Sequence, residues 1–356
     1  MKKFIIGVTL LSFISTANLV SAKEKLNIQD DIQGAERQVM EQVMQNMSPE
    51  EQENVIYVDE NGKVYANKSE LKKEVEKLTK IKDNLFEDGK GNRFAFPDQG
   101  EKPTENKVPS VLANSALVNP FSYFKKDPVK ILSASYPSLS GGTGPYRRVF
   151  SKPNYTWASA YAYLPGGTDM VDNNAAGGNG DTGYVYTGGW GNTGSAVDAG
   201  FMHGTTNHDW APMLQINGSA YGQTPRLSES QNVFLKFWVS GTGQISMYFA
   251  GIEKSTGLQI TRTYVYSAPG FSTTGGNIIK RMTTIGQTTE SFTTGSHIRN
   301  VHWYSTYIGT SSTSNHAWVS TDQATDSFSG YHSYPNSTVV TVSYVNAGEE
   351  TDNINL

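Results

Sequence analysis

Aromatic and cationic side chains recur along three segments of the chain, residues 233–239, 259–267 and 301–308. Alternate side chains of a β-strand point to the same face, so each segment would present such residues together. Aromatic rings stack on the apolar faces of sugars, and cations bond their hydroxyls. If the strands are neighbours, the pattern predicts a carbohydrate-binding face; the alternative is an aromatic-covered structural face. The residues of this expected face are Lys236, Trp238, Arg262, Tyr264, Tyr266, His302 and Tyr304.

The acidic residues bear on whether this face could be catalytic. A glycosidase needs two carboxylates flanking the scissile bond, and in the second part of the chain Asp198 is the one acid within a predicted strand. A polysaccharide lyase needs a neutralising cation and a Tyr or His base, for which Arg262, His302 and Tyr304 are the candidates. Residues 248–251 resemble the Tyr-Phe-Lys-Ala-Gly strand of alginate lyases, but the lysine is missing and no Gln-Ile-His partner motif is present.

A second group of side chains with binding chemistry lies in one stretch of the chain. His203, His208, Asp209 and Trp210 are expected to cluster on a single loop. This cluster predicts either a binding site at the rim, with Trp210 in contact with the ligand, or a hydrogen-bonded plug. Neither this histidine pair nor the pair at 297 and 302 matches His-Glu-x-x-His, so zinc catalysis is not expected.

A Gly-rich stretch supplies carboxylates of the kind that Ca²⁺ accepts. Asp169, Asp172 and Asp181 lie close together in the sequence, although not in the spacing of an EF-hand. Asp and Asn are also ordinary turn residues. The stretch therefore suggests a calcium site or, as the simpler alternative, a set of turns.

The elements that must position these residues are β-strands. Across residues 120–356, short runs of β-branched and aromatic residues alternate with Gly, Ser, Thr and Asn turns at steady spacing. That pattern is typical of a β-sandwich or barrel. The clearest strands are expected at 184–187, 196–202, 212–216, 233–239, 244–250, 259–267, 301–308 and 339–344.

Residues 23–110, which include the small unit expected at 23–96, differ sharply in composition from residues 111–356. Charged residues crowd this part, whereas all 6 Trp and all 6 His lie beyond residue 110. Helices are expected over 32–47 and 69–86, with a capping box at Ser48 and an Asn-Gly hairpin at 55–66. The sequence predicts a small, mainly helical α+β unit that could be a propeptide, folding aid or spacer; the alternative is a partly disordered charged stalk. Residues 97–119 are expected to be a linker open to proteolysis.

The first 22 residues have the layout of a secretory signal peptide. Lys2 and Lys3 precede an apolar run that is too short to span a bilayer, and Val20-Ser21-Ala22 offers small residues for cleavage. No later segment is apolar enough to be transmembrane. The sequence has 0 Cys, which excludes a disulfide framework. Its net charge of −4 gives no reason to expect nucleic acid or an anionic membrane as a partner. We expect a secreted, extracellular protein.

Three short motifs carry a resemblance to a known family. Residues 183–189 read Gly-Tyr-Val-Tyr-Thr-Gly-Gly, residues 198–201 read Asp-Ala-Gly-Phe, and residues 209–213 read Asp-Trp-Ala-Pro-Met. In these motifs the chain resembles the secreted Bacillus proteins of the YrpD type. The resemblance covers the middle of the β domain and implies a jelly-roll-like sandwich, similar to concanavalin-like lectins and lyases. It implies no particular activity.

Three functions remain open on these observations. The first is a secreted module that recognises a polysaccharide or a cell-surface or matrix ligand without catalysis. The second is a secreted polysaccharide lyase. The third is a toxin-like effector activated by proteolysis at the linker. The sequence does not indicate the oligomeric state.

Overall fold

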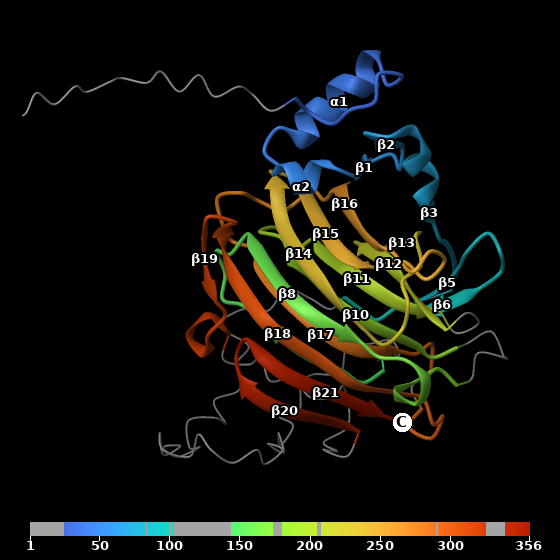
Figure 1. Cartoon of the computed structure of the whole chain (residues 1–356). Helices are drawn as coiled ribbons and strands as arrows, with labels where there is room; N and C mark the ends of the chain where they lie inside the picture. The colour runs from blue at the N-terminus through green and yellow to red at the C-terminus, as the bar shows by residue number, and fades with distance from the viewer. Residues whose placement is uncertain are drawn as a thin grey trace, which may run out of the picture.

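The computed structural model of the chain describes residues 25–82, 84–99, 102, 144–173, 180–204, 208–289, 291–324 and 339–356. The expected signal peptide and most of the expected linker lie outside these ranges. Within them, no helix is both long enough and apolar enough to span a membrane. Two large β-sheets pack face to face, which confirms the expected β-sandwich (Figure 1).

The first sheet is 11-stranded within the described ranges and forms the outer layer of the sandwich in Figure 1. Its strands lie in the order β2 (Val64–Ala66), β1 (Val55–Val58), β16 (Gln259–Ser267), β15 (Gln244–Ile252), β14 (Gln231–Gly241), β8 (Trp157–Leu164), β18 (His297–Ser311), β21 (Glu349–Asn355) and β20 (Val340–Asn346). Two short strands also pair with β18, namely β9 (Met170–Val171) and β19 (Ser314–Ala317).

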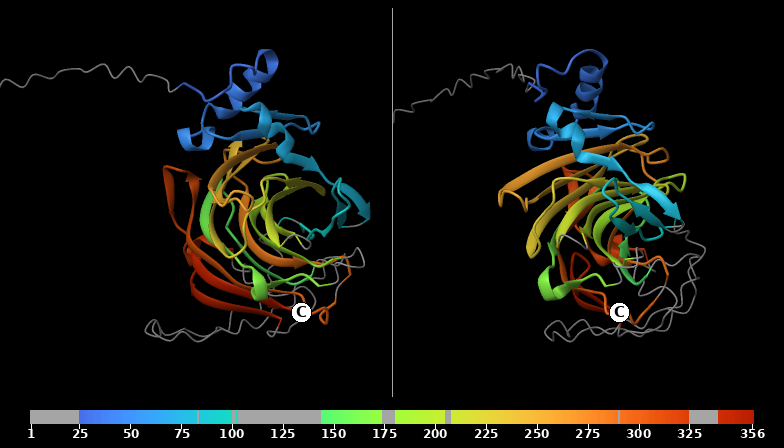
Figure 2. Two further views of the ribbon diagram at one scale, coloured as in Figure 1. Left: turned by 45° about the vertical axis from the view of Figure 1, so that its right-hand side comes forward. Right: turned by 90° about the vertical axis from the view of Figure 1, so that its right-hand side faces the viewer.

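The second sheet is 7-stranded and curves inside the first (Figure 2). Its order is β3 (Val75–Lys77), β13 (Ser219–Gln223), β12 (Asp209–Ile216), β11 (Ala196–Gly204), β10 (Thr182–Trp190), β17 (Ile278–Gly286) and β7 (Tyr146–Phe150). All eight runs expected from the sequence lie within or overlap strands of these two sheets.

The main core lies between the sheets and follows from the alternation of apolar residues. Val233, Leu235 and Phe237 of β14 point inward, and the ring of Phe249 meets that of Phe201 from the other sheet at 5.4 Å between centroids. Burying an apolar side chain of this size stabilises the fold by about 1.5–3 kcal/mol. The opposite side chains of β14 are left on the outer face.

The other face of the second sheet is covered by a small sheet of β4 (Thr79–Lys82), β5 (Leu85–Glu87) and β6 (Arg93–Ala95). Phe96, just after β6, packs against Phe86 and against Tyr184 of β10, with centroid distances of 5.1 and 5.4 Å. The second sheet is therefore buried on both faces here, which explains why every residue of β10, β11 and β17 is buried.

The charged N-terminal part lies across one end of the sandwich (Figures 1 and 2). It contains α1 (Gly34–Met44), α2 (Pro49–Gln52) and the β1–β2 hairpin, and the expected capping box between Ser48 and Glu51 is present. Strand β1 pairs in parallel with β16, and β3 pairs with β13. This part of the chain thus extends both sheets of the sandwich.

The helix expected over residues 69–86 is wrong. Only a short 3-10 helix, η1 (Ser69–Glu74), forms there, and the chain then runs into β3, β4 and β5. The Leu78 backbone N–H donates to the Ala220 carbonyl at 2.9 Å, which ties the segment to the edge strand β13. Strand pairing and the β-branched residues Val75, Thr79 and Ile81 outweigh the helical spacing of the apolar residues.

Buried charges cross the core between the two sheets. Arg147 of β7 donates to both carboxylate oxygens of Glu350 on β21 at 3.1 and 2.6 Å, and Arg281 of β17 lies 3.0 Å from the same carboxylate. Burial would raise the pKa of Glu350, but the two guanidiniums lower it. Asp352 accepts a hydrogen bond from Thr283 at 2.7 Å, and burial together with the charge of Glu350 raises its pKa to about 7.

Candidate functional site

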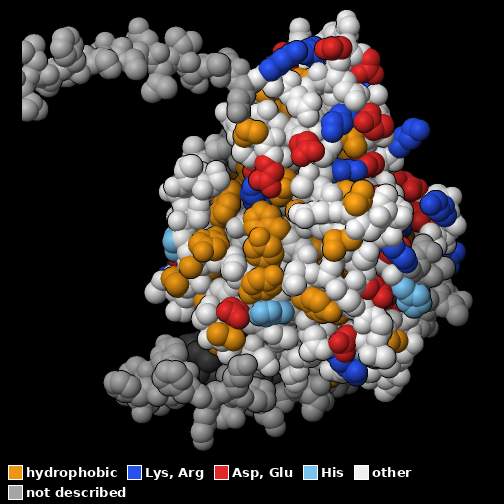
Figure 3. Space-filling view, in the orientation of Figure 1, with side chains coloured by type: hydrophobic (Ala, Val, Ile, Leu, Met, Phe, Trp, Pro, Cys, Tyr) orange, Lys and Arg blue, Asp and Glu red, His pale blue; other side chains and the backbone are white. Residues whose placement is uncertain are grey.

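A row of neighbouring rings, stacked at one end and tilted at the other, crosses the outer face of the first sheet. His302 and Tyr304 of β18 stack at 4.9 Å between centroids, and Tyr304 stacks on Tyr161 of β8 at 5.2 Å. Phe234 of β14 follows at 5.1 Å from Tyr161, and Tyr248 of β15 at 6.2 Å from Phe234. Figure 3 shows the band of hydrophobic side chains that lies over these strands. We call these five residues the aromatic row.

The spacing of the rings decides what the aromatic row offers a ligand. Tyr161 and Tyr304 are only 16° from parallel, so each ring covers part of the other's face. The middle of the row is therefore partly open, with Tyr161 being 40% exposed. At one end the imidazole of His302 lies 3.3 Å from Glu349, and both side chains are well exposed.

The other end of the aromatic row is covered by α2. The Tyr248 hydroxyl donates to Glu50, and the Lys236 ammonium lies 2.8 Å from Glu51 and 4.8 Å from the centre of the Tyr248 ring. Burial, and then the hydrogen bond and charge of Glu50, raise the pKa of Tyr248. Two neighbouring glutamates thus hold the N-terminal part against the outer face.

A groove of about 160 Å³ opens where α1 and α2 meet this face. Trp157 of β8 and Trp238 of β14 face one another across the strand pair and belong to its lining. Val43, Met47 and Val239 add apolar surface. We call this hollow the Trp groove. Its polar lining residues are Asn46, Glu51, Thr156, Ser240, Thr310, Ser311 and Ser312.

The structure divides the expected face between the two sides of the sheet. Lys236, Trp238, His302 and Tyr304 lie on the outer face, as the alternation within β14 and β18 predicts. Tyr264 is a cross-strand neighbour of Met247, which in turn is paired with Phe237, and all three point into the main core. Arg262, Tyr264 and Tyr266 therefore lie on the inner side, and the expectation of one shared face is corrected.

The inward residues of β16 are already engaged. Arg262 forms a two-pronged ion pair with Glu74 at 2.7 and 2.8 Å, and the Tyr264 hydroxyl donates to the Thr224 carbonyl at 2.7 Å. The residues expected for a lyase do not meet, because Arg262 is on the opposite side of the sheet from His302 and Tyr304.

The most exposed residue of the aromatic row, Tyr161, and one of the two tryptophans of the Trp groove come from a strand that we did not predict. Residues 157–164 alternate Trp and Tyr with Ala and Ser, and they form β8 at the centre of the first sheet. The many small residues hide the usual pattern of strand residues. The alternation of Trp157, Tyr161 and Tyr163 with alanine was the signal that could have found it.

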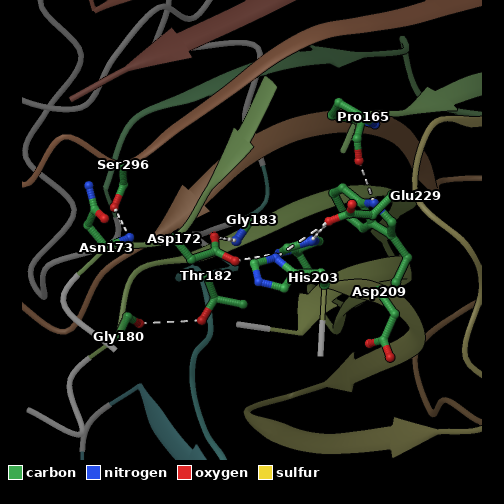
Figure 4. A network of polar contacts seen from close by, with 12 residues as sticks. Pro165, Asp172, Asn173, Gly180, Thr182, Gly183, His203, Asp209, Glu229 and Ser296 are labelled. Carbon is green, nitrogen blue, oxygen red and sulfur yellow. Dashed lines mark hydrogen bonds and ion pairs between the residues drawn. The ribbon is translucent and has the colours of Figure 1, made fainter. Parts of the chain in front are cut away.

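A second polar cluster lies near the end of β11 (Figure 4). The imidazole of His203 is hydrogen-bonded to Asp172 on one side and, at 2.8 Å, to Glu229 on the other. Burial would lower the pKa of His203, but the bonds and charges of Asp172 and Glu229 outweigh it and raise that pKa. His208 is exposed, with Nδ1 4.0 Å from Glu229.

Trp210 belongs to the same cluster and is fully buried. Its ring meets the His203 ring edge to face at 5.1 Å, and its Nε1–H donates to the Pro165 carbonyl at 2.9 Å. The cluster joins the segments before β10, at the end of β11 and before β14. It matches the hydrogen-bonded plug better than the open rim site that the sequence also allowed. The expectation of a single loop is corrected, because His203 lies in β11 and Trp210 in the paired strand β12.

The three aspartates of the expected calcium site take separate partners. Asp169 accepts from Asn300, Asp172 binds His203, and Asp181 accepts from Gln287 at 3.0 Å and Thr294 at 2.6 Å. No group of three His, Asp or Glu side chains in the described ranges is arranged to hold a metal ion.

Comparisons with known proteins place this chain in no family. No family model matches, and no curated protein matches significantly. Among solved structures, scytalido-glutamic peptidase with a peptide-based transition state analog has a TM-score of 0.35 and 10% identity, over 60% of this chain and 98% of that one. SCP-B, a member of the Eqolisin family of peptidases, has a TM-score of 0.33 and 10% identity, with the same shares covered. Likeness at this level supports no inference about activity, and the resemblance to the YrpD type stays a prediction.

Proposed function

We propose that the chain is an exported protein that binds a neutral glycan on the outer face of its β-sandwich, without catalysis. The observation that carries this proposal is the Trp groove, where two tryptophans meet a set of hydroxyl and amide groups beside the aromatic row. Aromatic surface with convergent hydrogen-bonding groups is what a pyranose ring requires. The signal-like pattern of residues 1–22 supports export. We also infer a jelly-roll-like path for the main strands.

The charges around the Trp groove favour a neutral ligand. Glu51 is the one acidic residue among those that line it, and its carboxylate is already paired with Lys236 at 2.8 Å. The remaining polar lining residues are uncharged. An uncharged sugar residue, whose polar groups are hydroxyls, needs no oppositely charged side chain in the groove.

The same arrangement argues for binding without catalysis. A glycosidase would need two carboxylates across the bond, and the described lining supplies one, which is already paired. A lyase would need Arg262 beside His302 and Tyr304, whereas Glu74 holds it on the other side of the sheet. Neither alternative, nor the toxin-like effector, has an observation comparable to the Trp groove.

Glycan-array and polysaccharide pull-down measurements with Trp238→Ala test the proposal. Because the ring supplies much of the apolar surface in the groove, its loss should weaken binding about tenfold, which corresponds to about 1.4 kcal/mol. Asn46→Ala, which removes only an amide from the lining, should weaken binding about threefold.

Leu258→Ala provides the matched control, since Leu258 is 66% exposed and lies outside the Trp groove. This variant should bind as the wild type does. Binding of no polysaccharide by the wild type, or equal binding by a folded Trp238→Ala variant, would refute the proposal.

A further inference from the structure

A small cavity lies in the core between the two sheets, separate from the Trp groove. Its volume is about 10 Å³, which is room for about one water molecule or a monatomic ion. Arg281 of β17, Trp303 and Thr306 of β18, and Trp318 line one part of it. The rest of its lining comes mainly from small or apolar residues of β8, β10 and β14.

Besides Nη1 of Arg281, which lies 3.0 Å from the Glu350 carboxylate, three polar atoms of these lining residues have no hydrogen-bond partner in the described part of the chain. They are Nε of Arg281, Oγ1 of Thr306 and Nε1 of Trp318, and each of the three residues is at most 3% exposed. The Arg and Trp nitrogens can only donate. An unsatisfied buried donor costs about 1–3 kcal/mol, and native proteins rarely leave several together. The cavity therefore calls for an occupant that accepts hydrogen bonds.

The charges beside the cavity favour an anion as this acceptor. Arg281 and Arg147 share the single carboxylate of Glu350. The remaining guanidinium bond that the structure shows for Arg281 goes to the neutral Ala347 carbonyl at 3.0 Å. Asp352 is the other acid here, and its raised pKa, about 7, leaves it largely protonated in mildly acidic solution. In mildly acidic solution the two guanidiniums thus face one ionised carboxylate, that of Glu350.

We propose that the cavity binds one monatomic anion, which is chloride in ordinary salt solutions. The Nε–H of Arg281, the Nε1–H of Trp318 and the hydroxyl of Thr306 donate to it. Because these groups come from β17, from β18 and from the chain beyond β19, the anion joins the two sheets at the charged end of the core. The site is independent of glycan binding, so either proposal can fail without the other.

Crystals of the full-length protein grown in sodium bromide give the direct test. Diffraction at the bromine absorption edge should show an anomalous peak inside the cavity. A peak without anomalous signal would identify an ordered water and overturn the anion assignment, and so would an empty cavity.

Thermal unfolding in different salts gives the test in solution. At equal ionic strength, sodium chloride should raise the Tm by about 2–4 °C relative to sodium gluconate, because the anion binds only the folded state. Thr306→Val keeps the shape of the side chain but removes the hydroxyl, and Trp318→Phe removes the N–H. Each should reduce this difference by at least half.

Trp210→Phe is the control, because Trp210 is a buried tryptophan whose N–H is already bonded to Pro165. It should lower the Tm in both salts and leave the difference between them unchanged. Equal Tm values for the wild type in chloride and gluconate would contradict the proposal, as would an undiminished difference in both Thr306→Val and Trp318→Phe.

Discussion

At the scale of single residues, Asp352 couples the stability of the sandwich to pH. Its carboxyl is buried beside Glu350, and its pKa of about 7 lies well above the usual value of 3.8. Between these values the unfolded chain has lost a proton that the folded chain keeps. The contribution of Asp352 to the free energy of unfolding is therefore greatest below about pH 4 and is lost progressively as the pH rises to about 7.

Asp352→Asn should remove this pH dependence. The amide oxygen can still accept the hydrogen bond from Thr283, but the side chain can no longer ionise. At pH 8 we expect the free energy of unfolding of the variant to equal that of the wild type or to be higher by up to about 1–2 kcal/mol. Between pH 4 and 7 it should change less with pH than that of the wild type. Urea unfolding at several pH values would measure both. Parallel profiles for the two proteins would contradict the raised pKa.

It is also at the scale of single residues that the candidate site was hardest to predict from the sequence. In β14, apolar residues alternate strictly with Phe234, Lys236 and Trp238, so the outward face could be predicted. In β16 both faces are mixed, and alternation says only that Arg262 and Tyr264 point the same way. Which side faces the core depends on the pairing of β16 with β15 at one edge and with β1 at the other, and neither partner can be read from the strand itself.

At the scale of elements, Asn67 joins the pieces of the N-terminal part. It is fully buried after β2, accepts from the Val55 N–H at 2.9 Å, and donates to the carbonyls of Asn27, Gln52 and Glu53 at 2.7–3.0 Å. One side chain thus satisfies backbone groups from the start of β1, the end of α2 and the chain before α1. These elements are too short to be stable alone.

Asn67→Ala should therefore destabilise the protein by about 2–4 kcal/mol, since it leaves several buried backbone groups without partners. Asn61→Ala is the comparison, because Asn61 is exposed in the hairpin turn, and its effect should stay within about 0.5 kcal/mol. Guanidinium unfolding would measure both values. Equal effects of the two substitutions would show that the buried amide contributes nothing particular.

Elements were predictable where local rules act alone. The capping box at Ser48 and the Asn-Gly turn between β1 and β2 were both predicted, because each depends only on residues that are close together in the sequence. The segment 69–86 was not, because its apolar spacing suits a helix as well as successive short strands. Partners on β13, more than a hundred residues away, decide between them.

At the scale of the whole molecule, strands from both sides of the composition change near residue 110 pair with one another. Ile56 of β1 belongs to the same core cluster as Phe237 of β14 and Phe201 of β11. We therefore expect a single cooperative unfolding transition for the described part of the protein. Ile56→Ala should lower that one transition by the equivalent of about 2–5 kcal/mol.

Differential scanning calorimetry measures this directly. Val345→Ala, at a residue that is 55% exposed, should leave the transition nearly unchanged. A separate low-temperature transition that alone responds to Ile56→Ala would show that the N-terminal part unfolds independently.

The parallel pairing of β1 with β16 has a consequence for how the protein must be made. Asn54 and Thr261, which are hydrogen-bonded next to this pairing, are 207 residues apart in the chain. A strand synthesised early therefore stays without its neighbour until most of the polypeptide has followed it, and closing so large a loop is slow. If the chain is exported from its N-terminus, β1 is unpaired outside the membrane during this time, where chaperones and proteases can bind it. Survival of the protein would then depend on the speed of its own completion.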